Sequence, residues 1–156
     1  TQGFYYGVNQ GVKKMKELKF RAFHKPSKKM FDVGMIDFLA NELIGIEDLG
    51  NGFSMGHFNK QIKDCELMQF TGLKDVDGKE IFEGDIVEIK FDDYYSNNSF
   101  TIDEDSTHKG EIVFEFFGYY IKFPDMCFMS INDIADYEFN IKVLSNIYEN
   151  GDLICQ

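Results

Sequence analysis

The sequence predicts a mainly β protein, with a small barrel in its C-terminal part, an accessory β region before it and at most short helices. The apolar residues are rich in aromatics, with 17 Phe, 8 Tyr and no Trp, and flat rings pack well on a pleated sheet. Several stretches alternate between apolar and polar residues with the period of a strand. Turn residues separate these stretches every ~8–12 residues, as in small barrels and sandwiches.

The chain divides into three parts by composition. Residues 1–14 are expected to be an N-terminal extension or tag-like segment, because Gly, Asn and Gln are frequent there and no period is visible. Residues 15–68 are expected to form the accessory β region, and residues 69–156 the barrel region. At 156 residues, the whole fits one compact domain or two small ones that share a core.

The accessory region opens with a predicted hairpin. Lys16–Phe23 alternates as a strand, His24–Lys29 supplies the turn, and Met30–Phe38 returns as an apolar stretch. Residues 41–56 contain four glycines, so turns are expected there rather than a long helix.

The strongest hairpin signal lies in Gln69–Phe91. Asp77-Gly78 stands between two apolar runs, and such a pair favours a tight turn because Gly adopts positive φ without steric cost. In the return strand Val87, Ile89 and Phe91 share one face, which is the alternation of a half-buried antiparallel strand.

The remaining elements follow the same logic. Residues 92–109 are polar and acidic and are expected to form a long loop. Gly110–Phe123 predicts a second hairpin with its turn at Gly118, and in this hairpin Ile112, Phe114 and Phe116 are expected on one face. Ser130–Asp136 predicts a single helical turn with Ser130 as N-cap. Phe139, Ile141 and Val143 alternate as a last strand.

One short pattern points to the type of barrel. Gly84-Asp85-Ile86-Val87 follows a turn, and this pattern recurs in SH3-like barrels, where the Gly-Asp pair makes a sharp entry into a strand. Gly84 is expected for its backbone geometry, and Asp85 is expected to accept a hydrogen bond from a local amide. The fold class is therefore expected to include an SH3-like barrel within 69–156.

Four segments together resemble the YopX family of small phage and prophage proteins from Gram-positive bacteria. They are Met15–Phe23, Leu67–Asp75, Gly78–Val87 and Ser145–Asn150. Their order and spacing resemble the family's from Met15 to the end, although residues 1–14 are extra and Asn150-Gly151 replaces the Asn-Pro common at family ends. The resemblance implies a mainly β fold with an SH3-like C-terminal part, a phage origin and the cytoplasm of a bacterial host. It implies no activity and no catalytic residue.

The charge is unevenly placed. The net charge is −11, with +3 on residues 1–74 and −13 on residues 75–139. An acidic block repels phosphate, which disfavours nucleic acid as its partner. The block could serve solubility, attract a basic protein or imitate the charge of DNA. Eight cations between Lys13 and Lys29 could instead bind phosphate, or they could pair with the acidic block within the chain or between subunits.

No constellation of catalytic residues is visible, so the chain is expected not to be an enzyme and to need no cofactor. The three histidines are far apart and are expected to be exposed, and no Ser or Cys lies in a nucleophile motif. Asp103, Glu104 and Asp105 do not fit the spacing of a calcium loop, so a solvated loop is favoured over a metal site. The three cysteines form no CxxC pair, and no apolar run reaches the ~20 residues that span a membrane.

The predicted function is therefore a protein-interaction module with a host or phage partner, or with a second copy of itself. Aromatic residues crowd the stretch 91–123, and with few cations beside them core packing or a protein interface is favoured over stacking on bases. A Tyr ring buries area and keeps a polar group. The candidate partner-binding residues are Tyr94, Tyr95, Tyr119, Tyr120, Asp103, Glu104 and Asp105. The alternative function is nucleic-acid binding through the basic N-terminal hairpin.

Overall fold

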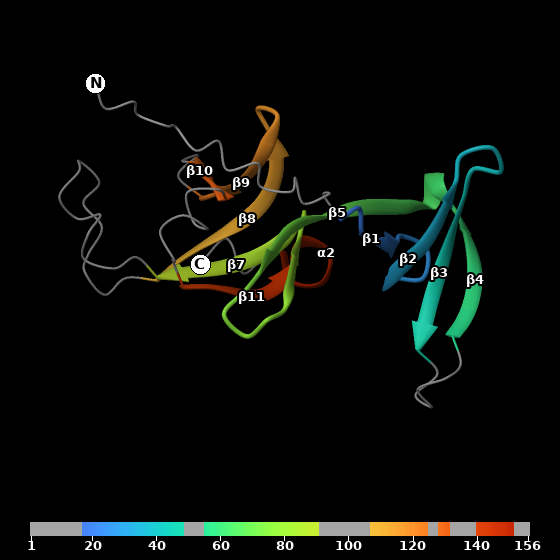
Figure 1. Ribbon diagram of the computed structural model, residues 1–156, viewed down its shortest axis with the longest axis horizontal. Helices are drawn as coiled ribbons and strands as arrows, with labels where there is room; N and C mark the ends of the chain where they lie inside the picture. The colour runs from blue at the N-terminus through green and yellow to red at the C-terminus, as the bar shows by residue number, and fades with distance from the viewer. Residues whose placement is uncertain (1–16, 49–54, 91–106, 125–127, 132–139, 152–156) are drawn as a thin grey trace, which may run out of the picture.

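Two antiparallel sheets lie side by side in an elongated molecule (Figure 1). The computed structural model describes residues 17–48, 55–90, 107–124, 128–131 and 140–151. The first sheet has the order β4-β3-β2-β1-β5-β6 and the second the order β10-β9-β8-β7-β11. The strands of the first sheet are β1 (Phe20–His24), β2 (Lys29–Asp37), β3 (Glu42–Asp48), β4 (Met55–Gln61), β5 (Cys65–Lys74) and β6 (Glu80–Phe82). The strands of the second are β7 (Asp85–Lys90), β8 (Thr107–Glu115), β9 (Gly118–Lys122), β10 (Phe128–Ser130) and β11 (Asn140–Asn146).

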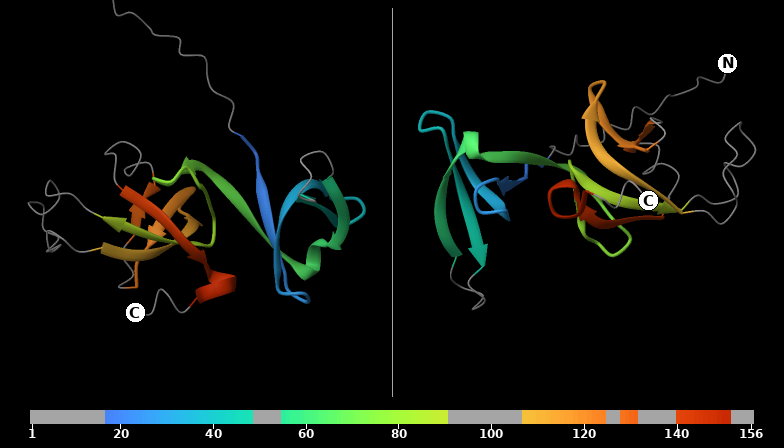
Figure 2. Two further views of the ribbon diagram at one scale, coloured as in Figure 1. Left: turned by 90° about the horizontal axis from the view of Figure 1, so that it is seen from below. Right: turned by 180° about the vertical axis from the view of Figure 1, so that it is seen from behind.

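The long strand β5 connects the two halves. Its first part pairs with β1, where Cys65 lies opposite His24, and its last residues pair with β6, where Lys74 lies opposite Glu80. Figures 1 and 2 show β5 running from the curled first sheet to the strands of the second. The predicted boundary between residues 68 and 69 falls inside this strand.

Three clusters of buried side chains fill the molecule. The largest lies mainly on the second sheet, with Ile81 of β6 added to it, and contains Ile81, Val87, Ile89, Ile112, Tyr119, Ile121, Ile131, Ile141 and Val143. A second lies where the halves meet, and it contains Phe23, Met68, Phe70 and Phe82 with Met30 and Tyr148 against them. Tyr148 belongs to the short helix α2 (Ile147–Asn150), and its ring stacks on Phe23 at 4.8 Å between centroids. The third cluster, Ala22, Leu43 and Cys65, belongs to the first sheet.

The first hairpin forms as predicted, with β1 and β2 paired from Phe20 opposite Val33 to His24 opposite Lys29. Turns were expected across 41–56 in place of a long helix; Glu42–Asp48 is instead the strand β3, which pairs with β4, while residues 49–54 lie outside the described residues. Gly45 lies inside β3, where a Cβ atom would stand 2.3 Å from Cζ of Phe58 and 2.8 Å from Cδ2 of Phe31. This glycine makes room for two rings and does not turn the chain.

The turn between β5 and β6 is held by a buried carboxylate. Gly78 has a φ of +81°, as the Asp-Gly signal predicts. Oδ1 of Asp75 accepts hydrogen bonds from the backbone N–H groups of Asp77 and Lys79 at 2.9 and 2.8 Å, and Oδ2 accepts one from Val143 at 3.0 Å. Asp75 therefore fastens this turn to β11.

The entry into β7 also agrees with the sequence. Gly84 has a φ of +75°, and Oδ2 of Asp85 accepts a hydrogen bond from the backbone N–H of Phe82 at 2.8 Å. The last strand is confirmed as β11, which pairs with β7. It is followed by α2, whose first turn is capped by the side chain of Asn146.

The mainly β fold is confirmed, but the described strands form two sheets and no closed barrel. The SH3-like barrel therefore stays a prediction. Predicted features that lie outside the described residues are the extension 1–14, most of the loop 92–109 and nearly all of the helical turn 130–136. The end of that loop is already strand, because β8 begins at Thr107. Within the described ranges, no helix is long and apolar enough to cross a membrane.

Candidate functional site

The turn between β8 and β9 carries Phe117, the most exposed aromatic residue of the described chain. Glu115 pairs with Gly118, so the turn consists of Phe116 and Phe117 alone. The Phe117 side chain is fully exposed, Phe116 is 69% exposed, and Phe114 just before them is about half exposed. We call Phe114, Phe116 and Phe117 the aromatic turn; Figure 1 shows the β8–β9 hairpin that carries it projecting from the second sheet.

The backbone of this turn is strained. Phe116 has a φ of +48° and Phe117 a φ of +68°. Two-residue turns with both φ values positive match the twist of a hairpin, but they are normally built from Asn and Gly. A residue with a Cβ atom in this conformation costs about 1–2 kcal/mol. Lys28 and Asn41 also have positive φ, but in this turn the strained residues are exposed aromatic residues, which makes the turn a candidate site.

Phe116 continues into an aromatic cluster on the outer face of the second sheet. Its ring contacts Tyr120 and Phe128 edge to face, at 5.9 and 5.8 Å between centroids. Tyr120 and Phe128 also contact each other, at 6.4 Å. The prediction that Phe116 shares a face with Ile112 was wrong, because the strand ends at Glu115 and the turn redirects the ring.

The predicted partner-binding tyrosines of this hairpin lie on opposite faces. Tyr119 is only 7% exposed and belongs to the core, where its ring contacts Phe114 at 5.1 Å. Tyr120 lies half-buried in the outer aromatic cluster. Tyr94, Tyr95, Asp103, Glu104 and Asp105 lie outside the described residues. The sequence did contain a signal for the aromatic turn: the pair Phe116-Phe117 directly before a glycine that suggests a turn.

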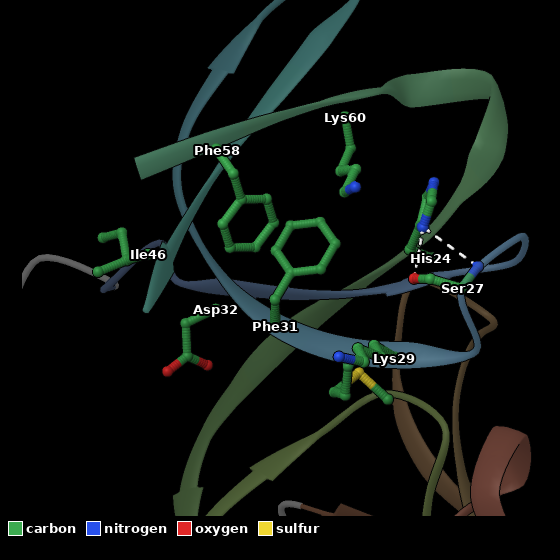
Figure 3. A pocket seen from close by; sticks show the side chains of 9 residues that line it. His24, Ser27, Lys29, Phe31, Asp32, Ile46, Phe58 and Lys60 are labelled. Carbon is green, nitrogen blue, oxygen red and sulfur yellow. Dashed lines mark hydrogen bonds between the residues drawn. The ribbon is translucent and has the colours of Figure 1, made fainter. Parts of the chain in front are cut away.

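A second candidate is a pocket of about 560 Å³ on the first sheet. Its lining comes from four strands and the β1–β2 turn, and consists of His24, Ser27, Lys29, Met30, Phe31, Asp32, Ile46, Phe58 and Lys60. Figure 3 shows the rings of Phe31 and Phe58 between the basic residues on one side and Asp32 and Ile46 on the other. The two rings meet edge to face at 5.1 Å, and both are half-buried.

Three of the described cations of the basic hairpin form ion pairs within the chain. Arg21 forms a buried ion pair with Asp85 at 2.7 Å, and Lys19 pairs with Glu80. Lys25 pairs with Glu66 at 3.1 Å in an exposed position. Two of these three acids belong to the acidic block, so part of the basic cluster neutralises that block within one chain.

Titratable groups near the middle of the molecule have shifted pKa values, but they form no recognisable catalytic set. Burial raises the pKa of Glu83 and of Glu111, and each carboxylate has a further acid near it. Burial also raises the pKa of the Cys65 thiol, which disfavours the reactive thiolate. Among the described residues, no group of three or more His, Cys, Asp or Glu side chains could hold a metal ion.

Known proteins resemble the chain over most of its length. A family model described as YopX protein matches residues 19–155. The crystal structure of protein EF1440 from Enterococcus faecalis is similar with 25% identity and a TM-score of 0.55, over 88% of this chain and 98% of that one. The structure of protein yopX from Bacillus subtilis is similar with 16% identity and a TM-score of 0.55, over 86% and 96%. No curated protein matches the chain.

Proposed function

The chain belongs to the YopX family, and from this premise we propose that it is a non-enzymatic protein-interaction module whose contact surface is the aromatic turn. The observation that carries the proposal is the full exposure of Phe117 in a left-handed conformation that Gly would adopt at lower cost. Neither solubility nor folding stability favours a Phe at this position. A binding role explains both its exposure and its strain.

The chemistry of the aromatic turn suits a protein partner. Aromatic residues are enriched at interfaces, and a ring that enters a partner's pocket can dominate the binding energy. The turn is also preorganised, because two residues between paired strands have little freedom to lose on binding. Tyr120 and Phe128 support Phe116 from the side and hold it in place.

Charge indicates what the partner offers. Glu115 lies directly beside the turn, and Glu111 lies opposite Lys122 at the other end of the hairpin. The part of the chain from 75 to 139 carries −13. We therefore expect an apolar pocket with a basic rim on a host or phage protein. The phage origin, the cytoplasmic location and the SH3-like barrel belong to this proposal as what the family resemblance implies.

Three other roles are less well supported. An acidic neighbourhood opposes insertion of the turn into an anionic membrane. Self-association would need a complementary pocket on the second copy. Nucleic-acid binding along the whole basic hairpin has less support because Arg21, Lys19 and Lys25 already pair with acids, which leaves fewer cations for phosphate.

Site-specific photocrosslinking tests the proposal. A photoreactive phenylalanine is placed at Phe117 and, as a matched control, at Leu39, which is 98% exposed on the first sheet. We expect one protein from a host lysate to crosslink at position 117 and not at position 39. The captured protein is then purified, and its Kd is measured with Phe117→Ser and Leu39→Ser. The proposal requires the first variant to bind at least about tenfold more weakly, as for an interface hot spot, and the second to bind as well as the parent chain.

Other results would contradict the proposal in different ways. Crosslinking of the chain to itself at position 117, with a dimer in light scattering, would replace a foreign partner with a second copy. Flotation with lipid vesicles that Phe117→Ser abolishes would indicate a membrane role. Equal capture at positions 117 and 39 would remove the aromatic turn as a specific surface.

A further inference from the structure

The pocket of the first sheet combines two kinds of binding group. Phe31 and Phe58 provide aromatic surface, and Lys29, Lys60 and His24 provide hydrogen-bond donors beside it. The volume of about 560 Å³ lies within the roughly 300–1,000 Å³ usual for small-molecule sites. A ligand that uses all of these groups has a flat ring and an anionic group close to it.

The donors lie on one side of the rings. Lys60 extends from β4 with its Nζ atom 5.6 Å from the centre of the Phe58 ring, and Lys29 is exposed at the start of β2. Asp32 lies across the rings from them (Figure 3). The lining is therefore polarised, with positive charge at one side and a carboxylate at the other.

The orientation of His24 adds a donor to the basic side. The backbone N–H of Ser27 donates to Nδ1 of His24 at 3.3 Å, and the Ser27 hydroxyl lies 2.6 Å from the same atom. Because Nδ1 accepts, the neutral ring carries its proton on Nε2. Figure 3 shows this second nitrogen on the side of Lys60, away from Ser27. The β1–β2 turn thus fixes a ring N–H that can donate to an anion.

The floor of the pocket depends on Gly45. A Cβ atom there would overlap both Phe58 and Phe31, at 2.3 and 2.8 Å. Strand β3 therefore has a glycine in its interior, and an interior glycine usually weakens a strand. In return the two rings lie against the backbone, and the space beside them stays open.

We infer that this pocket binds a nucleotide, with the base against Phe31 and Phe58 and the phosphate held by Lys29, Lys60 and Nε2 of His24. Bases stack on aromatic side chains with little dependence on sequence, and Lys binds phosphate as a point charge. The same chemistry is offered by a free mononucleotide and by a nucleotide within a single strand. Duplex DNA does not fit, because its bases are stacked inside the helix.

Calorimetric titration of the full chain tests the inference. The probes are AMP, UMP, an eight-nucleotide oligothymidylate and inorganic phosphate. Phe58→Leu removes the ring, and Phe58→Tyr keeps it. Lys29→Ala removes a cation from the pocket, and Lys79→Ala makes the same charge change at an exposed position in the β5–β6 turn. Circular dichroism checks that each variant is folded.

We expect nucleotides to bind and inorganic phosphate to bind more weakly. Phe58→Leu should weaken nucleotide binding roughly tenfold, the effect of one lost base–aromatic stack, while Phe58→Tyr keeps it. Lys29→Ala should weaken it about threefold, as for an exposed charge contact, and Lys79→Ala should leave it unchanged. The affinities of the mononucleotides and of the oligonucleotide are compared after correction for the number of phosphates in each. A higher corrected affinity for the mononucleotides identifies a free nucleotide as the ligand, and a higher one for the oligonucleotide identifies a single strand.

Three results would overturn the inference. The first is no heat of binding with any nucleotide at millimolar concentration. The second is phosphate binding as tightly as AMP, which would leave the rings without a role. The third is equal weakening by Lys29→Ala and Lys79→Ala, which would indicate general charge attraction. None of these results bears on the aromatic turn, which lies on the other sheet.

Discussion

Arg21 in β1 and Asp85 in β7 form a buried ion pair that joins the two halves of the molecule. Nη2 of Arg21 lies 2.7 Å from Oδ1 of Asp85, although 64 positions separate them in the sequence. The Arg21 guanidinium also lies over the Phe82 ring, at 4.8 Å from its centroid. Burial raises the pKa of the Asp85 carboxyl, and Arg21 opposes that rise. Removal of either residue would therefore leave the other in a buried position without its opposite charge.

Removal of one partner should destabilise the fold strongly. Arg21→Met leaves the Asp85 carboxylate buried without its cation, and breaking a buried pair in this way costs about 3–5 kcal/mol. Urea denaturation at neutral pH measures the loss. The loss should shrink at acidic pH, because the uncompensated carboxyl can then be protonated. The control is Lys25→Ala, which breaks the exposed pair with Glu66 and should cost at most about 1 kcal/mol. Equal losses for both variants would contradict a structural role for the buried pair.

The Asp75 carboxylate should make stability depend on acid pH. Burial would raise its pKa, but three backbone N–H donors outweigh burial and hold the pKa below its ordinary value of 3.8. A depressed pKa stabilises the folded state above that ordinary value, and this stability is lost as the pH falls through the folded pKa. Asp75→Asn should therefore lower the free energy of unfolding by about 1.5–3 kcal/mol at neutral pH. The difference in stability between the variant and the parent chain should disappear below about pH 3.8.

Urea denaturation across the acid range measures this prediction. The control is Asp77→Asn in the same turn, because Asp77 is exposed and loss of its exposed pair with Lys142 should cost at most about 1 kcal/mol. If the difference in stability between Asp75→Asn and the parent chain stays constant down to the lowest pH, the charge of Asp75 does not stabilise the turn.

The aromatic turn should be more stable without its exposed ring. Phe117→Gly removes a Cβ atom from a left-handed residue and loses no buried contact, so the free energy of unfolding should rise by up to about 1 kcal/mol. Leu39→Gly is the matched control, since Leu39 is equally exposed but does not have a positive φ. It should lower stability by about 0.5–1 kcal/mol through chain entropy. A loss of stability in both variants would show that the turn is not strained.

Gly45 should tolerate no side chain. In Gly45→Ala the added methyl group overlaps Phe58 and Phe31, and overpacking of this kind costs about 1–3 kcal/mol. Thermal unfolding measures the loss. Gly151→Ala is the control, because nothing lies within 4 Å of the added atom. It should be neutral or slightly stabilising. A neutral Gly45→Ala would mean that the rings move aside easily, and the pocket would then lack a fixed floor.

Local sequence signals predicted the elements whose causes are local. The β1–β2 hairpin follows from alternation, and the turns at Gly78 and Gly84 follow from the need for positive φ. The β3–β4 hairpin could not be predicted in this way. Gly45 is required by rings on two other strands, and a glycine required by distant contacts looks the same in a sequence as one required by a turn.

The β8–β9 hairpin was predicted, but its turn lies next to the predicted position. The turn was predicted at Gly118, but Phe116 and Phe117 form it. In a strand a shift of one residue moves a side chain to the other face. Alternation with Ile121 places Tyr119 on the apolar face and Tyr120 on the opposite one, and the structure confirms this separation. The residues that line the pocket come from four strands. No local sequence pattern could predict that these residues lie together.

Strand β5 pairs with β1 at one end and with β6 at the other, and Ile81 of β6 packs into the core of the second sheet. Strand β5 therefore links the two separate surfaces. A nucleotide in the pocket of the first sheet and a protein bound at the aromatic turn would not compete for space. The same molecule could hold both at once and so bring them into proximity, with a separation fixed by a paired strand instead of a flexible linker.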